Sequence, residues 1–261
     1  MMAPAKIQEA VELLIAARGD HRRLDAFPPS CRPETFEDGH AIQEAFVRAW
    51  SVPIAGYKIG CTSPQTQKLL GAPAPFPGRI FAPVRLNSPA KVAAKAFHKL
   101  GIEPEFAFTL ARDLPGRATP YTRDEVAAAV AAVHGAIELV DTRWNDWFKV
   151  GVASIVADNG ANGGLILGPP VADWRKIDLP KAMATLRFDD KVVAEGTGAA
   201  VLGNPLDALV WLANHLSGRG YGLKAGEAVT TGTVASVYFA EPGMIVTADF
   251  GPIGKVELRF A

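Results

Sequence analysis

The chain has 261 residues, 49% of them hydrophobic, with 27 basic and 27 acidic side chains. This length and composition suit one large globular domain, or one domain with a small appendage, and the balanced charge argues against nucleic acid or an anionic membrane as partner. A small-molecule substrate is therefore expected. The two cysteines, Cys31 and Cys61, have no paired spacing, which argues against a disulfide framework and a cysteine zinc site.

The N-terminal part has a helical pattern. Apolar residues recur at helical spacing over residues 6–18 and again over 34–50, with a proline-containing loop between these segments. No stretch of eighteen apolar residues occurs, and the chain starts on a polar, amphipathic segment unlike a signal-peptide core. We expect a cytoplasmic protein with a small helical N-terminal region over residues 1–53.

From residue 54 the pattern changes to short β-type runs separated by Gly and Pro. The predicted strands are 54–61, 79–86, 102–111, 134–141, 164–167, 184–188, 191–195, 228–233, 244–249 and 255–260. Helix-start signals precede three helices, at Ser63-Pro64, at Thr122 with Glu125, and at Asn204-Pro205. Strands and helices alternate too irregularly for a Rossmann or barrel fold. The prediction is an α+β fold with a mostly antiparallel β core over residues 54–261 and helices packed outside it.

The first candidate site is a pair of glutamates, Glu103 and Glu105, in an otherwise apolar strand. Alternate residues of a strand share a face, so the two Cβ atoms should lie roughly 7 Å apart. Two carboxylates at that distance repel by roughly 2 kcal/mol at an effective dielectric constant near 20. A hard divalent cation such as Mg²⁺ or Mn²⁺ would compensate them. The alternative is the solvent face of an edge strand, where Pro104 would also be tolerated.

Glu138 is the third candidate ligand because it also interrupts an apolar strand pattern. Three carboxylates around one divalent ion would leave coordination positions for water or for a chelating substrate, as in catalytic metal sites. Nothing in the sequence alone requires Glu138 to lie near the other two glutamates.

Lys58 is the second chemical candidate and lies in the strand segment Gly56-Tyr57-Lys58-Ile59-Gly60. The flanking glycines would let a substrate approach closely, and the ammonium group could bind a carboxylate or exchange protons. The alternative is a charged residue that protects an exposed strand from aggregation. Thr62 and Ser63 follow, and their hydroxyl and amide groups could hold an anion or form a helix cap.

Further polar clusters lie later in the chain. Asn159 belongs to a Gly/Asn-rich turn, Thr233 ends a strand in the sequence Thr-Thr-Gly-Thr, and Asp141 is followed by an arginine and two tryptophans. Each could contact a ligand, or could serve a turn or a subunit interface. The five histidines show no metal-ligand spacing.

Several of these segments together resemble the 2-keto-4-pentenoate hydratase and 4-oxalocrotonate decarboxylase branch of the fumarylacetoacetate hydrolase superfamily. The resemblance spans essentially the whole chain, in the order Gly56-Tyr57-Lys58-Ile59-Gly60, Glu103-Pro104-Glu105, Glu138-Leu139-Val140-Asp141, Ala157-Asp158-Asn159 and Thr230-Thr231-Gly232-Thr233. It implies a fumarylacetoacetase-like fold, a rolled, mixed β-sandwich with an N-terminal helical region, and a homo-oligomer.

The resemblance also implies roles for individual residues. Glu103, Glu105 and Glu138 would bind Mg²⁺ or Mn²⁺, Lys58 would lie beside a bound 2-oxo acid, and Thr233 would approach the substrate carboxylate. The reaction would be hydration of a 2-hydroxy-dienoate or 2-oxo-enoate in aromatic-compound catabolism, with Lys58 transferring a proton or stabilising the enolate.

One segment departs from the pattern of these hydratases, which usually carry an acid at the position of Phe76. Nearby Arg79 could bind a second substrate carboxylate and so favour a diacid. A 4-oxalocrotonate-type decarboxylase is therefore an alternative activity. Two further alternatives are a C–C hydrolase of acylpyruvates, for which His40 and Glu44 offer one acid–base pair, and a non-catalytic partner subunit of a catabolic enzyme complex.

Overall fold

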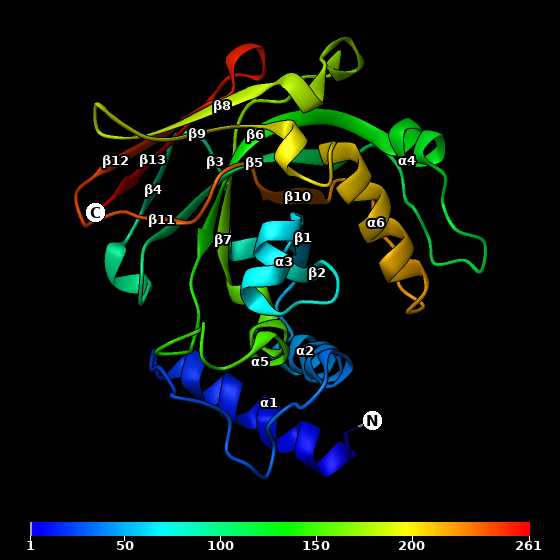
Figure 1. Ribbon diagram of the computed structural model, residues 1–261, viewed down its shortest axis with the longest axis vertical. Coiled ribbons are helices and arrows are strands. Elements are labelled where there is room, and N and C mark those ends of the chain that lie inside the picture. Colours follow the sequence, from blue (N-terminus) through cyan, green and yellow to red (C-terminus); the bar gives the residue numbers. More distant parts are fainter. Residues whose placement is uncertain (1) are drawn as a thin grey trace.

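Two β-sheets form the centre of the computed structural model, which describes residues 2–261 (Figure 1). The first sheet has eight strands, in the spatial order β2 (Phe76–Phe81), β1 (Ile54–Gly60), β10 (Ala228–Thr233), β5 (Gly101–Leu110), β6 (Val130–Val140), β7 (Asn162–Leu167) and β3 (Arg85–Asn87), with β11 (Tyr238–Phe239) paired to β5. The second has five strands, in the order β4 (Ala90–Val92), β13 (Lys255–Phe260), β12 (Ile245–Asp249), β8 (Met183–Phe188) and β9 (Lys191–Thr197). The pairs β1–β10, β3–β7 and β4–β13 are parallel, and the other named pairs are antiparallel.

Six α-helices surround the sheets: α1 (Pro4–Gly19), α2 (Phe36–Trp50), α3 (Pro64–Leu70), α4 (Arg123–Ala129), α5 (Val152–Ala157) and α6 (Pro205–Ser217). Figure 1 shows α1, α2 and α5 at the opposite end of the molecule from the five-stranded sheet. Between residues 2 and 261 there is no helix of the length and apolar character needed to cross a membrane. The predicted α+β fold is confirmed. Met1, the first residue of the predicted helical region, lies outside the described residues.

The helix starts follow the signals read from the sequence. Ser63 accepts a hydrogen bond from the amide of Thr66 at the start of α3, and Thr122 and Glu125 form a reciprocal capping box at α4. The Asn204 side chain caps α6 in the same manner. Each cap satisfies a backbone N–H that has no partner within the helix, which explains why these residues begin the helices.

One predicted strand was wrong. The segment 79–86 is divided into β2, which begins earlier at Phe76, a short 3₁₀ turn at Ala82–Val84, and β3. Pro83 lies in this turn, where its missing N–H costs no ladder hydrogen bond. The helix α5 and the short strands β4 and β11 were missed, since segments of six residues or fewer carry little periodicity.

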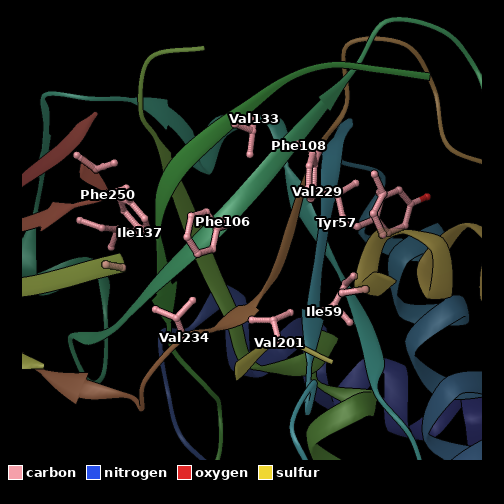
Figure 2. Packing of buried hydrophobic residues seen from close by; sticks show 14 of the residues in the cluster. Tyr57, Ile59, Phe106, Phe108, Val133, Ile137, Val201, Val229, Val234 and Phe250 are labelled. Atoms are coloured by element: carbon pink, nitrogen blue, oxygen red, sulfur yellow. The ribbon is translucent and has the colours of Figure 1, made fainter. Parts of the chain in front are cut away.

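The two faces of the eight-stranded sheet differ in character. Phe106 and Phe108 of β5 point into the main apolar core together with Ile137 of β6 and Val229 of β10 (Figure 2). Residues of the opposite parity point to the other face, where a smaller buried cluster contains only Ile80, Ala107, Ala136, Leu165, Leu167 and Ala228. The glutamates of β5 and β6 belong to this second face.

A buried ionic network connects the N-terminal helix to the sheet. The Asp158 carboxylate accepts hydrogen bonds from Arg18 Nη2 at 2.9 Å, from Thr142 Oγ1 at 2.9 Å, and from the Arg143 backbone at 2.8 Å. Burial alone would raise the pKa of Asp158, but the Arg143 and Arg18 guanidinium groups outweigh it and hold that pKa below its usual value.

Replacing Asp158 by Asn should therefore lower the free energy of unfolding by about 3 kcal/mol, because Arg18 and Arg143 would remain buried without their counter-charge. Urea denaturation of the two proteins measures this difference. The control is Asp173→Asn, which removes an exposed ion pair with Lys176 and should cost less than about 1 kcal/mol. Equal effects of the two substitutions would contradict the buried-network interpretation.

Candidate active site

Three glutamates meet on one face of the sheet because of strand alternation and strand register. Glu103 and Glu105 are two residues apart on β5, and Glu103 lies directly opposite Glu138 of β6 in the antiparallel ladder. Each of the three carboxylates offers an oxygen atom, and these oxygens all lie within 4.8 Å of one another. The sequence predicted the face shared by Glu103 and Glu105, and the register brings Glu138 to them.

The carboxylates are shielded from solvent and incompletely hydrogen-bonded. Glu105 and Glu138 are fully buried, and Glu103 is partly buried. The Gly232 amide donates to Glu105 Oε2 at 2.7 Å, and Asn162 Nδ2 donates to Glu138 Oε1 at 3.0 Å. Within residues 2–261 the second oxygens, Glu105 Oε1 and Glu138 Oε2, have no hydrogen-bond partner.

Lys58 is the cation nearest to this cluster. Its Nζ lies 3.4 Å from Glu138 Oε1, and its side chain is almost completely buried. Burial would lower the pKa of Lys58, but Glu138, Glu103 and Glu105 outweigh it, so the pKa lies above its ordinary value and the amine is protonated. The three carboxylates and one ammonium, if all are ionised, carry a net charge of −3 + 1 = −2.

The remaining negative charge raises the carboxyl pKa values. Burial, followed by repulsion from Glu138, raises the pKa of Glu103 to about 7, and burial together with both neighbours raises that of Glu105 well above its usual value. A divalent cation would neutralise the charge of −2 and give the unpartnered oxygens a ligand. The all-oxygen donor set fits a hard ion such as Mg²⁺ or Mn²⁺. These residues therefore fit a divalent metal site.

Glycines make room for the Lys58 side chain. A Cβ atom on Gly78 of β2 would lie 3.0 Å from Lys58 Cγ, and one on Gly60 would lie 3.3 Å from Lys58 Nζ and only 2.7 Å from the Phe76 ring. Side chains at these positions would collide with the lysine or with its neighbour. Gly60 thus leaves room for Phe76 and Lys58, and Gly78 for the Asn159 carbonyl and Lys58, whereas the sequence interpretation had assigned the glycines that flank Lys58 to substrate approach.

A cavity of about 160 Å³ opens beside Lys58 and Glu103. Thr62, Ser63 and Thr233 line it, together with the backbone of Gly232. Gly232 must also lack a side chain, because a Cβ atom there would lie 1.8 Å from Thr62 Oγ1. The structure therefore brings three of the five predicted substrate-binding residues to the same cavity as Lys58 and Glu103.

Asn159 has a different position. Its Oδ1 accepts from the Arg79 amide at 2.7 Å, and its Nδ2 donates to the Arg79 carbonyl at 2.8 Å, so its side chain is fully used by the backbone of β2. Asn159, Gly160 and Ala161 all have positive φ angles. Asn159 therefore fixes the strained turn that presents Gly160 and Ala161 to the cavity.

The prediction that Arg79 binds a substrate carboxylate requires correction. Arg79 lies opposite Tyr57 in the β1–β2 ladder, whereas Lys58 lies opposite Gly78, so Arg79 points to the other face of the sheet. Its guanidinium donates to Gln43 Oε1 at 2.8 Å and to Glu44 Oε1 at 2.5 Å. The charge of Arg79 is therefore already paired away from the cavity.

The suggested acid–base pair of a C–C hydrolase is also absent from the cavity wall. Glu44 is paired with Arg79, and His40 packs against Phe36 and His215. Burial, followed by the charge of Arg219, lowers the pKa of His40 to about 3, which keeps the imidazole neutral and weakly basic. Neither residue lines the cavity beside Lys58.

Comparisons with known proteins agree with this geometry. The sequence profile described as "Fumarylacetoacetate (FAA) hydrolase C-terminal" matches residues 63–261. The chain belongs to the fumarylacetoacetate hydrolase family. A 2-keto-4-pentenoate hydratase of Paraburkholderia xenovorans is 30% identical over 99% of this chain and 96% of its own length. A 2-hydroxyhexa-2,4-dienoate hydratase of Comamonas testosteroni is 34% identical over 80% of each chain.

A solved structure of this fumarylacetoacetate hydrolase family superimposes over nearly the full length. It is a 4-oxalocrotonate decarboxylase from Pseudomonas putida G7 complexed with magnesium and adipate, with a TM-score of 0.90 and 26% identity over 100% of this chain and 99% of that one. The fumarylacetoacetase-like fold expected from the sequence is thereby confirmed. These relatives include both hydratases and a decarboxylase.

The raised carboxyl pKa values predict an unusual dependence of stability on pH. Without metal, the folded protein keeps protons on Glu103 and Glu105 that the unfolded chain has lost above its ordinary carboxyl pKa of about 4.3. The free energy of unfolding should therefore fall as the pH rises from about 5 to 8 in EDTA. The fall is measured relative to a Glu105→Gln variant, which has the same histidines and so shares their contribution to the pH dependence. Saturating Mg²⁺ should remove this decline.

Thermal or urea unfolding in EDTA and in MgCl₂ measures the effect. Glu241→Gln, at an exposed position, is the matched control and should follow the unmodified protein at every pH. The free energy of unfolding of the unmodified protein is compared with that of Glu105→Gln in EDTA. If the difference between them does not change with pH, the interpretation that Glu103, Glu105 and Glu138 are buried and repel one another would be contradicted.

Proposed function

We propose that this chain is a divalent-metal-dependent hydratase that adds water to a 2-hydroxy-dienoate or 2-oxo-enoate in aromatic-compound catabolism. Glu103, Glu105 and Glu138 would hold Mg²⁺ or Mn²⁺, and Lys58 would act in proton transfer. The observation that carries the proposal is the cluster of three carboxylates with a buried lysine, which meets a small cavity at Glu103 and Lys58. The named hydratases among its relatives support the same reaction.

The chemistry divides between the ion and the protein. A bound divalent cation would supply Lewis-acid stabilisation of negative charge on the 2-oxygen of the substrate. Lys58 Nζ borders the cavity and is held by Glu138, so its proton can pass to or from a substrate carbon without a change in the lysine's position. Glu138, in turn, is oriented by the Asn162 side chain.

Hydroxyl groups of the cavity wall suit the other tasks of a hydratase. Thr62, Ser63 and Thr233 would bind the carboxylate end of the substrate, and Thr66 and Ser236 also line the cavity. A water molecule that adds to a substrate needs two to four polar partners to be held in place. These side chains can provide them in a cavity whose remaining wall is largely apolar.

A decarboxylase is the second candidate, and Phe76 favours it. The ring of Phe76 lies beside Lys58, with the ring centroid 5.7 Å from Nζ, where the related hydratases would be expected to carry an acid. Apart from Glu103, no carboxylate of residues 2–261 lines the cavity to act as a base toward water. Loss of carbon dioxide needs no such base. The structural similarity to a 4-oxalocrotonate decarboxylase also supports this alternative.

A substrate panel distinguishes these activities. The purified protein is incubated with Mg²⁺ and 2-hydroxypenta-2,4-dienoate, 4-oxalocrotonate or an acylpyruvate, and the products are identified by mass spectrometry. We expect gain of water without cleavage of the carbon chain. Release of carbon dioxide would assign the decarboxylase activity, C–C cleavage would assign a hydrolase, and Mg²⁺ binding without any turnover would favour a non-catalytic partner subunit.

Lys58→Met tests the proposed proton transfer. The substitution keeps an unbranched side chain of similar length but removes the ammonium group, so kcat should fall by about 10²- to 10⁴-fold. Mg²⁺ affinity, measured by calorimetry, should not weaken, because the substitution removes a cation and no metal ligand. Lys149→Met, which removes an exposed lysine, is the control and should leave kcat unchanged. Normal turnover of Lys58→Met would exclude Lys58 from the mechanism.

A further inference from the structure

The cavity beside Lys58 has two chemically different ends. The end nearest the glutamates carries the ammonium of Lys58 and the carboxylate of Glu103. Thr233, opposite Glu105 in the ladder, and Thr62, which contacts Gly232, lie at the same end. The rest of its wall is mainly apolar and includes Leu70, Phe76, Val140, Trp147, Ile155 and Val237. A substrate whose 2-oxo acid head lies at the charged end must therefore place its tail among hydrocarbon and aromatic groups.

No cation is available at the apolar end to receive a second carboxylate. Lys58 and Glu103 are the only charged side chains among the described residues that line this cavity. Lys58 is already paired with Glu138, and a divalent ion would bring the cluster of Lys58 and three ionised carboxylates only to neutrality. A charged group buried without a partner carries a desolvation penalty that a methyl group does not.

The nearest other cations are separated from the cavity by the protein itself. Arg79 lies on the opposite face of the sheet and is paired with Glu44. Arg23 and Lys99 line a different, much smaller hollow, for which Val140 and Trp147 form the shared wall. A tail carboxylate in the main cavity would thus face Val140 and Trp147 in place of these cations.

The cavity has room for a small organic molecule. Its volume of about 160 Å³ is close to that of a cavity that holds a benzene-sized ligand. The side chains of Leu69 and Phe148 extend the apolar wall to the surface, where they are 67% and 56% exposed. An apolar tail of several carbons could therefore be covered along its whole length.

We propose that this cavity selects 2-oxo and 2-hydroxy acids with an uncharged, apolar tail of several carbons over dicarboxylates of the same length. The inference rests on the proposed function for the position of the acid head at the glutamates. It adds the chemical class of the tail, and it assigns the selection to the apolar residues of α3, to Phe76 and to the segment around Trp147.

A matched pair of unreactive ligands tests the selection without turnover. 2-Oxohexanoate and 2-oxoadipate have the same head and chain length and differ in a terminal methyl group or carboxylate. Calorimetry on the Mg²⁺-loaded protein should show at least tenfold tighter binding of 2-oxohexanoate. Equal affinity, or tighter binding of 2-oxoadipate, would overturn the proposal.

Tail length gives an independent measurement. Each methylene group buried against the apolar wall should tighten binding by about fourfold. 2-Oxohexanoate, which has two more methylene groups, should therefore bind about fifteenfold more tightly than 2-oxobutanoate on the same Mg²⁺-loaded protein. An affinity that does not change with chain length would show that the tail lies outside the apolar part of the cavity, and would overturn the inference.

A cation added to the apolar end should reduce the selection. Leu70 lies at the end of α3, a helix without buried residues, so Leu70→Arg should fold. This variant should lower the ratio of 2-oxohexanoate affinity to 2-oxoadipate affinity at least threefold. Leu69→Arg, at the rim of the cavity, is a second variant in case the first is unstable. Leu70→Gln controls for lost apolar surface, and Val192→Arg adds the same charge at an exposed site on the other sheet. An unchanged ratio in folded Leu70→Arg and Leu69→Arg would contradict the proposal.

The hydratase activity and the selection of the tail can be tested separately. Discrimination between the matched ligands without turnover of any panel substrate would support the tail selection and overturn the hydratase. Turnover of 2-hydroxypenta-2,4-dienoate without discrimination would support the hydratase and overturn the tail selection.

Discussion

The structure depends on one electrostatic constraint, the burial of three carboxylates on a single face of a sheet. Carboxylate oxygens within 4.8 Å of one another repel strongly in a medium from which water is largely excluded. Lys58, the Gly232 amide and the Asn162 side chain each reduce this repulsion, but together they leave two oxygens without a partner. With all three carboxylates ionised the site would stay negative after its local partners are counted, so its residues fit a cation from outside the chain.

The constraint extends to residues that never touch the carboxylates. A Cβ atom on Gly78 would lie 3.0 Å from Lys58 Cγ, and one on Gly60 would lie 3.3 Å from Lys58 Nζ, so both glycines leave room beside the lysine. Other groups lie closer still, since a Cβ on Gly78 would lie 2.4 Å from the Asn159 carbonyl oxygen and one on Gly60 would lie 2.7 Å from the Phe76 ring. Asn159 holds the turn that follows α5 to β2 through two hydrogen bonds to the Arg79 backbone. The two glycines are thus explained by the close packing of Lys58, Phe76 and this turn together.

The parts of the site that follow from strand periodicity could be predicted from the sequence. Alternation places Glu103 and Glu105 on one face whatever the partner strands are. The approach of Glu138 could not be derived in this way, because the register between β5 and β6 is set by packing over the whole ladder. The assignment of Arg79 failed for the same reason, since its face depends on pairing with Tyr57 of β1.

Two partners of the carboxylates were missed for different reasons. The Gly232 amide is a backbone group, and a sequence gives no sign of where a backbone N–H will point. Asn162 belongs to a turn rich in Gly and Asn, where its type is fully explained by conformation. Its contact with Glu138 becomes visible only when β7 is paired with β6. In both cases the missing information was tertiary.

One end of the cavity is formed by strands of the sheet and the other by segments outside it, so the two ends can vary separately. The acid-binding end is formed by β1, β5 and β6, whose mutual register fixes the glutamates and Lys58. The tail end is formed largely by α3 and the segment around Trp147, which lie outside the paired strands. Changes at the tail end can therefore alter which substrates fit without moving the carboxylates.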